Sequence, residues 1–200
     1  MTRLLLTCGF VGAVLFVVTF LIDGATRPGY RPLYHPVSAL ALGTRGWVQT
    51  SNFVVTGLLM IAAAAGTREA LGVTFGPALL ALFGAGLVVS GVFTMDPMRG
   101  YPPGTEAGTP AVLSPRHKVH DVFGFVLFAS LAAAMLTFGL ALEGAWKAYT
   151  LATAASVIAL IVVFGAAWKR DSPRIGLLQR LMILVGWAWI AVFCLSLMSP

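Results

Sequence analysis

Six apolar runs, each about as long as a bilayer is thick, constrain the fold of this chain more than any other feature. A transmembrane helix needs about 20 mostly apolar residues. In lipid, every backbone polar group must be satisfied inside the protein, so each run is predicted to be an α-helix. The sequence therefore predicts an all-α, polytopic membrane protein: a compact bundle of six transmembrane helices within a single domain, 1–200. The predicted spans are roughly 4–22, 47–66, 74–95, 115–142, 148–168 and 179–198.

The composition excludes several soluble classes of protein. Hydrophobic residues make up 58% of the chain and charged residues 10%, whereas a soluble domain carries about a quarter charged residues. The net charge of +6 does not indicate a nucleic-acid partner, because the positive residues lie near the predicted helix ends. Cys8 and Cys194 fall inside apolar runs, where a thiol behaves as a small hydrophobe. We therefore expect an integral protein of the cell membrane that is surrounded by bilayer lipid and has no nucleic-acid partner.

Two long loops rich in proline and glycine, 23–46 and 96–114, are predicted to lie on one face of the bundle. The connections between the second and third spans and between the fourth and fifth are much shorter, so those helix pairs should form tight hairpins. Ser114 and Pro115 predict the start of the fourth helix, with serine as the N-cap and proline in the first helical position.

Positive residues are distributed unequally between the two sides of the predicted bundle. The side with the long loops carries ten of them: Arg27, Arg31, Arg45, Arg99, Arg116, Lys118, Lys169, Arg170, Arg174 and Arg180. The other side carries Arg3, Arg68 and Lys147. The positive-inside rule therefore predicts cytoplasmic long loops and both termini outside. Arginines that bind an anionic head group would produce the same count.

The densest polar group stands at the start of the fourth span. His117, His120 and Asp121 have the spacing i, i+3 and i+4, which places them on one helix face. Gly124 continues this stripe one turn deeper, where it is expected to allow close approach of a neighbouring helix. Asp96, after the third span, joins these three as a candidate catalytic residue.

Three interpretations of this polar group remain open. His117, His120 and Asp121, together with His35 or Asp96, could hold a divalent metal such as zinc. The same side chains could act as a general base and its orienting carboxylate, and a helix N-terminus favours neutral His117. They could also only hydrogen-bond a loop to the bundle. The pattern H-x-x-H-D lacks the longer-range spacing of a known metal signature.

Further polar residues at the same helix ends are candidates for ligand binding, and we expect them to converge with the first group on one pocket. Ser38 beside His35 could be a nucleophile, although the more ordinary interpretation is that Ser38 caps a short helix, 39–42. The arginines could bind phosphate or carboxylate, or simply be solvated. The candidate ligand-binding residues are Asp23, His35, Ser38, Gln49, Asn52, Arg116 and Arg180.

The order of several short motifs resembles a bacterial and archaeal family of six-span membrane proteins catalogued as a domain of unknown function. The residues that carry the resemblance are His35-Pro36-Val37-Ser38 with Leu40 and Gly43, Trp47, Asn52-Phe53 with Gly57, Asp96-Pro97, His117-x-x-His120-Asp121 and Gly176-Leu177-Leu178-Gln179-Arg180. The resemblance covers nearly the whole chain. It implies the six-span architecture and no activity.

Three functions fit these features. The first is a membrane protein that binds a lipidic or amphipathic ligand, or a partner subunit, in a polar pocket on the long-loop face. The second is an intramembrane enzyme, either a metal-assisted hydrolase or an acid/base isomerase or cyclase, that acts on a lipid or isoprenoid through His117, His120 and Asp121. The third, a transporter, is disfavoured because no acidic residue or histidine lies in the middle of any span.

Overall fold

The apolar runs of the sequence form six long α-helices in the computed structural model, which describes residues 1–199. All six are long and apolar enough to cross a membrane, and no β-strand is present within the described range. The predicted all-α, six-span architecture is thus confirmed. The helices are α1 (Thr2–Thr26), α2 (Gly46–Leu71), α3 (Phe75–Val92), α4 (Pro115–Ala141), α5 (Gly144–Lys169) and α6 (Ile175–Met198), with a short 3-10 helix, η1 (Val37–Ala41), between α1 and α2.

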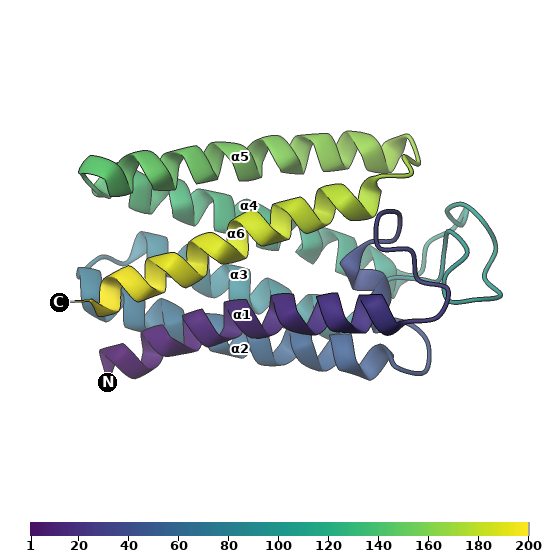
Figure 1. Ribbon diagram of the computed structural model, residues 1–200, viewed down its shortest axis with the longest axis horizontal. Coiled ribbons are helices and arrows are strands. Elements are labelled where there is room, and N and C mark those ends of the chain that lie inside the picture. Colours follow the sequence, from purple (N-terminus) through teal and green to yellow (C-terminus); the bar gives the residue numbers. More distant parts are fainter. Residues whose placement is uncertain (200) are drawn as a thin grey trace.

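The helices run up and down along one common axis (Figure 1). Both termini and the two tight hairpins lie at one end, and the two long loops lie with the α5–α6 connection at the other, here called the long-loop end. Each helix packs against the next one in the chain, and α6 also packs against α1. The bundle is therefore closed, and the ends of all six helices meet the long loops at one end of the molecule.

Small residues allow a very close contact between α2 and α3. A Cβ atom placed on Gly57 would lie 2.5 Å from the carbonyl oxygen of Gly84, and one on Gly84 would lie 2.6 Å from that of Gly57. Close approach of this kind is how membrane helices gain packing energy without a hydrophobic driving force between them. On the inner side of the bundle, the ring of Trp187 stacks on Phe16 and meets the edge of Phe83.

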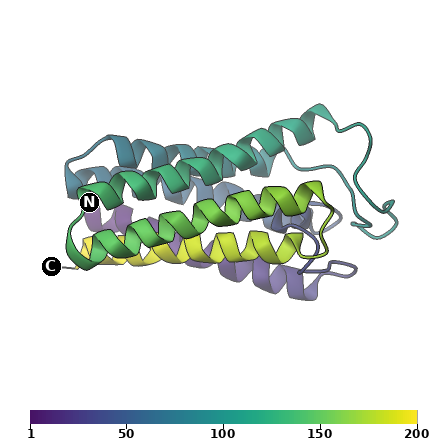
Figure 2. The ribbon, with the colours of Figure 1, turned by 90° about the horizontal axis from the view of Figure 1, so that it is seen from above.

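Helix α5 is packed least tightly. Only 17% of the most apolar 18-residue stretch of α5 is buried inside the protein, whereas 33 to 50% of the corresponding stretch is buried in each of the other five helices. In Figure 2, α4 and α5 lie close together at the hairpin that joins them and separate toward the long-loop end. This divergence leaves room between the two helices at the end where the polar residues gather.

Candidate functional site

The first long loop is fixed to the bundle by a buried ion cluster at the end of α1. Asp23 pairs with Arg27 at 2.5 Å and with Arg45 at 2.7 Å. The guanidinium of Arg27 also donates to the carbonyl oxygens of Leu40, Leu42 and Arg45. Hydrogen bonds in which the donor or the acceptor is charged are stronger than those between neutral groups. Asp23, a predicted ligand-binding residue, is thereby occupied by the two arginines.

Arg180 makes a second connection, between α6 and the same loop. Its Nη1 donates to the carbonyl oxygens of Pro32, His35 and Gly176, and its Nη2 donates to the Tyr30 hydroxyl at 2.6 Å. Burial raises the pKa of Tyr30 to about 12, although Arg180 acts in the opposite direction. The Arg180 guanidinium therefore holds a loop and has little capacity left for a ligand.

His35 lies within this loop cap, with both ring nitrogens engaged. Its Nδ1 accepts from the Arg31 N–H at 2.9 Å, and its Nε2 lies 3.1 Å from the carbonyl oxygen of Arg99, to which it donates. Burial lowers the pKa of His35, and the hydrogen bond to Arg99 opposes this shift only in part. His35 is a neutral link between the two long loops.

His117 and Asp96 form a third connection, at the first turn of α4. The Asp96 carboxylate accepts from the N–H and the hydroxyl of Ser114, at 2.8 and 2.6 Å. The Asp96 N–H in turn donates to His117 Nδ1 at 2.8 Å, so the proton of neutral His117 resides on Nε2. Burial opposes ionisation of Asp96, but the two hydrogen bonds from Ser114 act in the opposite direction, and the pKa of Asp96 is lowered. Ser114 caps α4 by accepting from the His117 N–H, which confirms the predicted helix start.

Three other predicted ligand-binding residues also contact neighbouring protein groups. Asn52 Nδ2 donates to the carbonyl oxygen of Phe16 on α1 and to Gln49 Oε1, and these two side chains are buried between α1 and α2. Arg116 is exposed and donates to the carbonyl oxygen of Val92, at the end of α3. The Asn52 contact with Phe16 joins α2 to α1, and the Arg116 contact joins α4 to α3.

The predicted metal ligands lie in three different environments. His35 is in the loop cap, His117 is in the α4 cap, and His120 and Asp121 face a cavity described below. Over residues 1–199, no three histidine, cysteine, aspartate or glutamate side chains are grouped so that they could hold a metal ion. The structure does not bring the four predicted ligands together.

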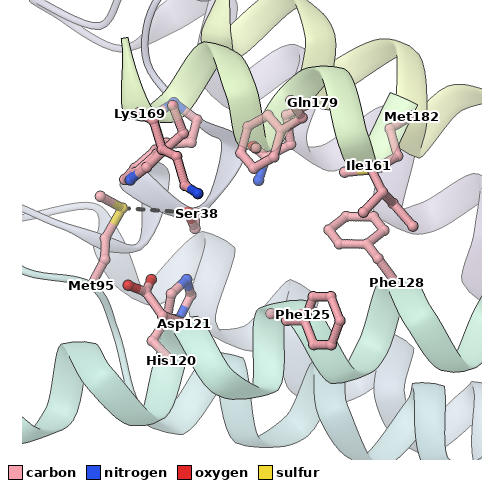
Figure 3. Close-up of a pocket in the computed structure, with 15 residues that line it drawn as sticks. Ser38, Met95, His120, Asp121, Phe125, Phe128, Ile161, Lys169, Gln179 and Met182 are labelled. Atoms are coloured by element: carbon pink, nitrogen blue, oxygen red, sulfur yellow. Dashed lines mark hydrogen bonds between the residues drawn. The ribbon is translucent and has the colours of Figure 1, made fainter. Parts of the chain in front are cut away.

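A cavity of about 350 Å³ opens where α4 and α5 separate, with α6 behind it (Figure 3). Its walls are apolar and come from all three helices. Its polar groups come from the long-loop end, where His120 reaches up from α4 toward Ser38 of η1. The apolar walls include Phe125, Phe128, Ile161, Phe164 and Met182, and the polar side chains are Ser38, His120, Asp121, Lys169 and Gln179.

Hydrogen bonds to the backbone fix how His120 and Gln179 face the cavity. His120 Nδ1 lies 3.1 Å from the carbonyl oxygen of Ser90 and 2.8 Å from that of Phe93, so it carries the proton and leaves Nε2 as an acceptor. Gln179 Oε1 accepts from the Val37 N–H at 2.6 Å, which leaves its amide protons free. The cavity therefore presents a neutral imidazole acceptor and an amide donor.

Comparison with known proteins identifies the family of the chain. The family model described as "Protein of unknown function (DUF998)" matches residues 10–196. The chain belongs to this family. No curated protein and no solved structure matches the chain. Membership agrees with the resemblance seen in the sequence motifs and assigns no activity. The six apolar helices indicate an integral membrane protein.

Two local predictions about the site were wrong. Gly124 was expected to admit a neighbouring helix, but no atom lies within 4 Å of the position that its Cβ would take, because Gly124 faces the cavity. Ser38 was expected to cap a helix over 39–42, but η1 begins at Val37 after Pro36. Ser38 lies inside η1, and its hydroxyl contacts Met95 Sδ at 3.3 Å.

Sequence reasoning missed Gln179, Lys169 and the aromatic walls of the cavity. Gln179 precedes Arg180 in the family motif and, with it, interrupts the apolar start of α6, and that contrast could have singled it out as a site residue. Lys169 was counted only as one of many positive residues at helix ends. Phe125 and Phe128 carry no distinguishing signal, because phenylalanine is common throughout the spans.

Arg27 and Arg45 provide a matched test of the ion cluster, since both pair with Asp23. The side chain of Arg27 is 5% exposed and that of Arg45 is 44% exposed. We predict that Arg27→Gln lowers the free energy of unfolding by about 3 to 5 kcal/mol, as expected for breaking a buried pair. Arg45→Gln should cost less than about 1 kcal/mol. Denaturation of both variants in mixed micelles measures this difference, and equal losses would contradict the role given to Arg27.

Proposed function

We propose that the cavity binds an amphipathic molecule of the lipid class. In this proposal the apolar chain lies between α4 and α5, and the polar group lies among Ser38, His120 and Gln179. The observation that carries the proposal is the division of a single cavity into apolar helical walls and a polar end. Its volume of about 350 Å³ falls within the usual range of small-molecule sites, roughly 300 to 1,000 Å³.

The position of the cavity supports access from the bilayer. Phe125 on α4 lines the cavity and is 66% exposed, so its side chain also lies on the outer surface of the bundle. Gly124 on α4 and Gly165 on α5 both line the cavity, and nothing lies within 4 Å of either Cβ position. At these two positions, neither helix carries a side chain that would block a ligand chain entering the cavity.

The arrangement favours binding over the catalytic alternative. A histidine that acts as a general base is usually oriented by a neighbouring side chain, such as a carboxylate, that accepts a hydrogen bond from its other ring nitrogen. Asp121 lies 3.2 Å from His117 Nε2, and His117 does not line the cavity. His120 is oriented instead by the backbone carbonyl groups of Ser90 and Phe93. His117, His120 and Asp121 are thus divided between a helix cap and a ligand cavity.

Filling the cavity from one helix tests the proposal. Gly165→Phe would place a ring in the cavity, and we expect at least a tenfold loss of lipid that remains bound through purification, measured by native mass spectrometry of the whole chain. Val162→Phe is the matched control, because Val162 on the same helix is 66% exposed and does not line the cavity. That variant should keep its lipid. Equal lipid occupancy in Gly165→Phe and the unaltered protein would refute the proposal.

We also propose that the long loops face the cytoplasm and that both termini lie outside. Of the ten positive residues on that side, Arg27, Arg99 and Arg180 are buried. The other seven are exposed, against three on the opposite side. The long-loop side therefore still carries more positive residues than the other side when the buried arginines are left out of the count, which is the asymmetry that the positive-inside rule uses.

A reporter fused to the C-terminus tests this orientation. Alkaline phosphatase, which is active only outside the cytoplasm, should be active in that fusion, whereas green fluorescent protein at the same place should stay dark. A fluorescent fusion without phosphatase activity would reverse the assignment.

A further inference from the structure

A smaller pocket of about 40 Å³ lies deeper in the bundle, next to the cavity between α4 and α5. The two spaces share five lining residues, Ser38, His120, Gly124, Phe128 and Gln179. The remaining walls of the inner pocket come from α1, α2, α3 and α6 as well as α4. Gly124, which has no side chain, lies on the boundary between the two spaces. A group at the end of a bound ligand therefore has room to enter the inner pocket.

Two buried hydrogen-bond donors belong to residues that line this inner pocket. Ser90 and Trp187 are each 1% exposed, and neither Ser90 Oγ nor Trp187 Nε1 has a partner within residues 1–199. A buried donor left without a partner costs about 1 to 3 kcal/mol, and such groups are rare in native proteins. Two residues further along α6, Trp189 Nε1 donates to Thr150 Oγ1 at 3.2 Å, which is the usual arrangement.

The chemistry of the inner pocket specifies what could satisfy these donors. None of its lining residues is charged. An ionised group there would be an uncompensated buried charge, so a charged head group is disfavoured. Ser90 and Trp187 both have a proton to donate, and the free amide protons of Gln179 lie on the boundary. A neutral oxygen acceptor is the group that fits.

We propose that the inner pocket receives the carbonyl oxygen of a neutral, long-chain ligand such as a ketone, which accepts from the buried donors of Ser90 and Trp187. This inference rests on the proposed function, because the chain of the same ligand occupies the larger cavity. The pocket volume of about 40 Å³ accommodates a carbonyl group or a water molecule but not a sugar or a phosphate ester.

Three probes of similar chain length test the inference: pentadecan-2-one, pentadecane and hexadecanoate. Their binding to the whole chain in micelles is measured by equilibrium competition against a fluorescent fatty ketone. The unaltered protein should bind the ketone more tightly than the alkane or the anion. Ser90→Ala and Trp187→Phe should each reduce the preference for ketone over alkane about three- to tenfold, as expected for one net hydrogen bond. Trp189→Phe, the matched control on the same helix, should leave the preference unchanged.

The outcomes separate this inference from the proposed function. If ketone and alkane bind equally, or hexadecanoate binds best, or the preference survives both Ser90→Ala and Trp187→Phe, the carbonyl site is refuted and ordered water becomes the partner of the donors. The proposed function survives any of these results as long as Gly165→Phe abolishes binding. If binding of all three probes is insensitive to Gly165→Phe, both proposals fall.

Discussion

Arginine side chains that donate to backbone carbonyl oxygens hold the long-loop end of this membrane protein together. Loops that leave the helical ladder expose carbonyl groups, and each one buried without a partner is costly. Arg27 satisfies three carbonyl groups around η1, and Arg180 satisfies three between α6 and the first loop. Because η1 supplies Ser38 to the cavity, the site depends on these bonds although neither arginine lines it.

The two sides of the bundle differ in how tightly they are packed. The α2–α3 contact is so close that glycine is required on both helices, whereas α4 and α5 separate and leave glycines facing open space. The open side therefore has the least buried helix, the cavity and the polar end of the site together. The tightly packed side of the bundle holds α3 and α6 in place, and α4 and α5 separate in front of them. This arrangement is suited to holding a ligand that enters from the lipid.

The sequence was sufficient to predict the helices and the family but not the division of polar residues among three environments. Apolar runs of about 20 residues have only one way to cross a bilayer, so the six helices follow directly. The spacing of His117, His120 and Asp121 places them on one helix face but does not say which neighbours that face meets. In the structure, His117 is bonded to the loop at Asp96, while His120 is bonded to the end of α3 and borders the cavity. The roles of the arginines were equally hidden, because charge patterns do not reveal the path of an irregular loop.

The most direct test of the central claim, that the cavity is a lipid-class ligand site, is photocross-linking in the intact membrane. Benzoylphenylalanine in place of Phe128, which borders both the cavity and the inner pocket, is compared with the same residue at the exposed position of Val162. Mass spectrometry should find one discrete small lipid attached at position 128 and the bulk phospholipids of the membrane at position 162. Attachment at position 128 only to side chains of the protein, or to the same phospholipid mixture as at position 162, would contradict the account.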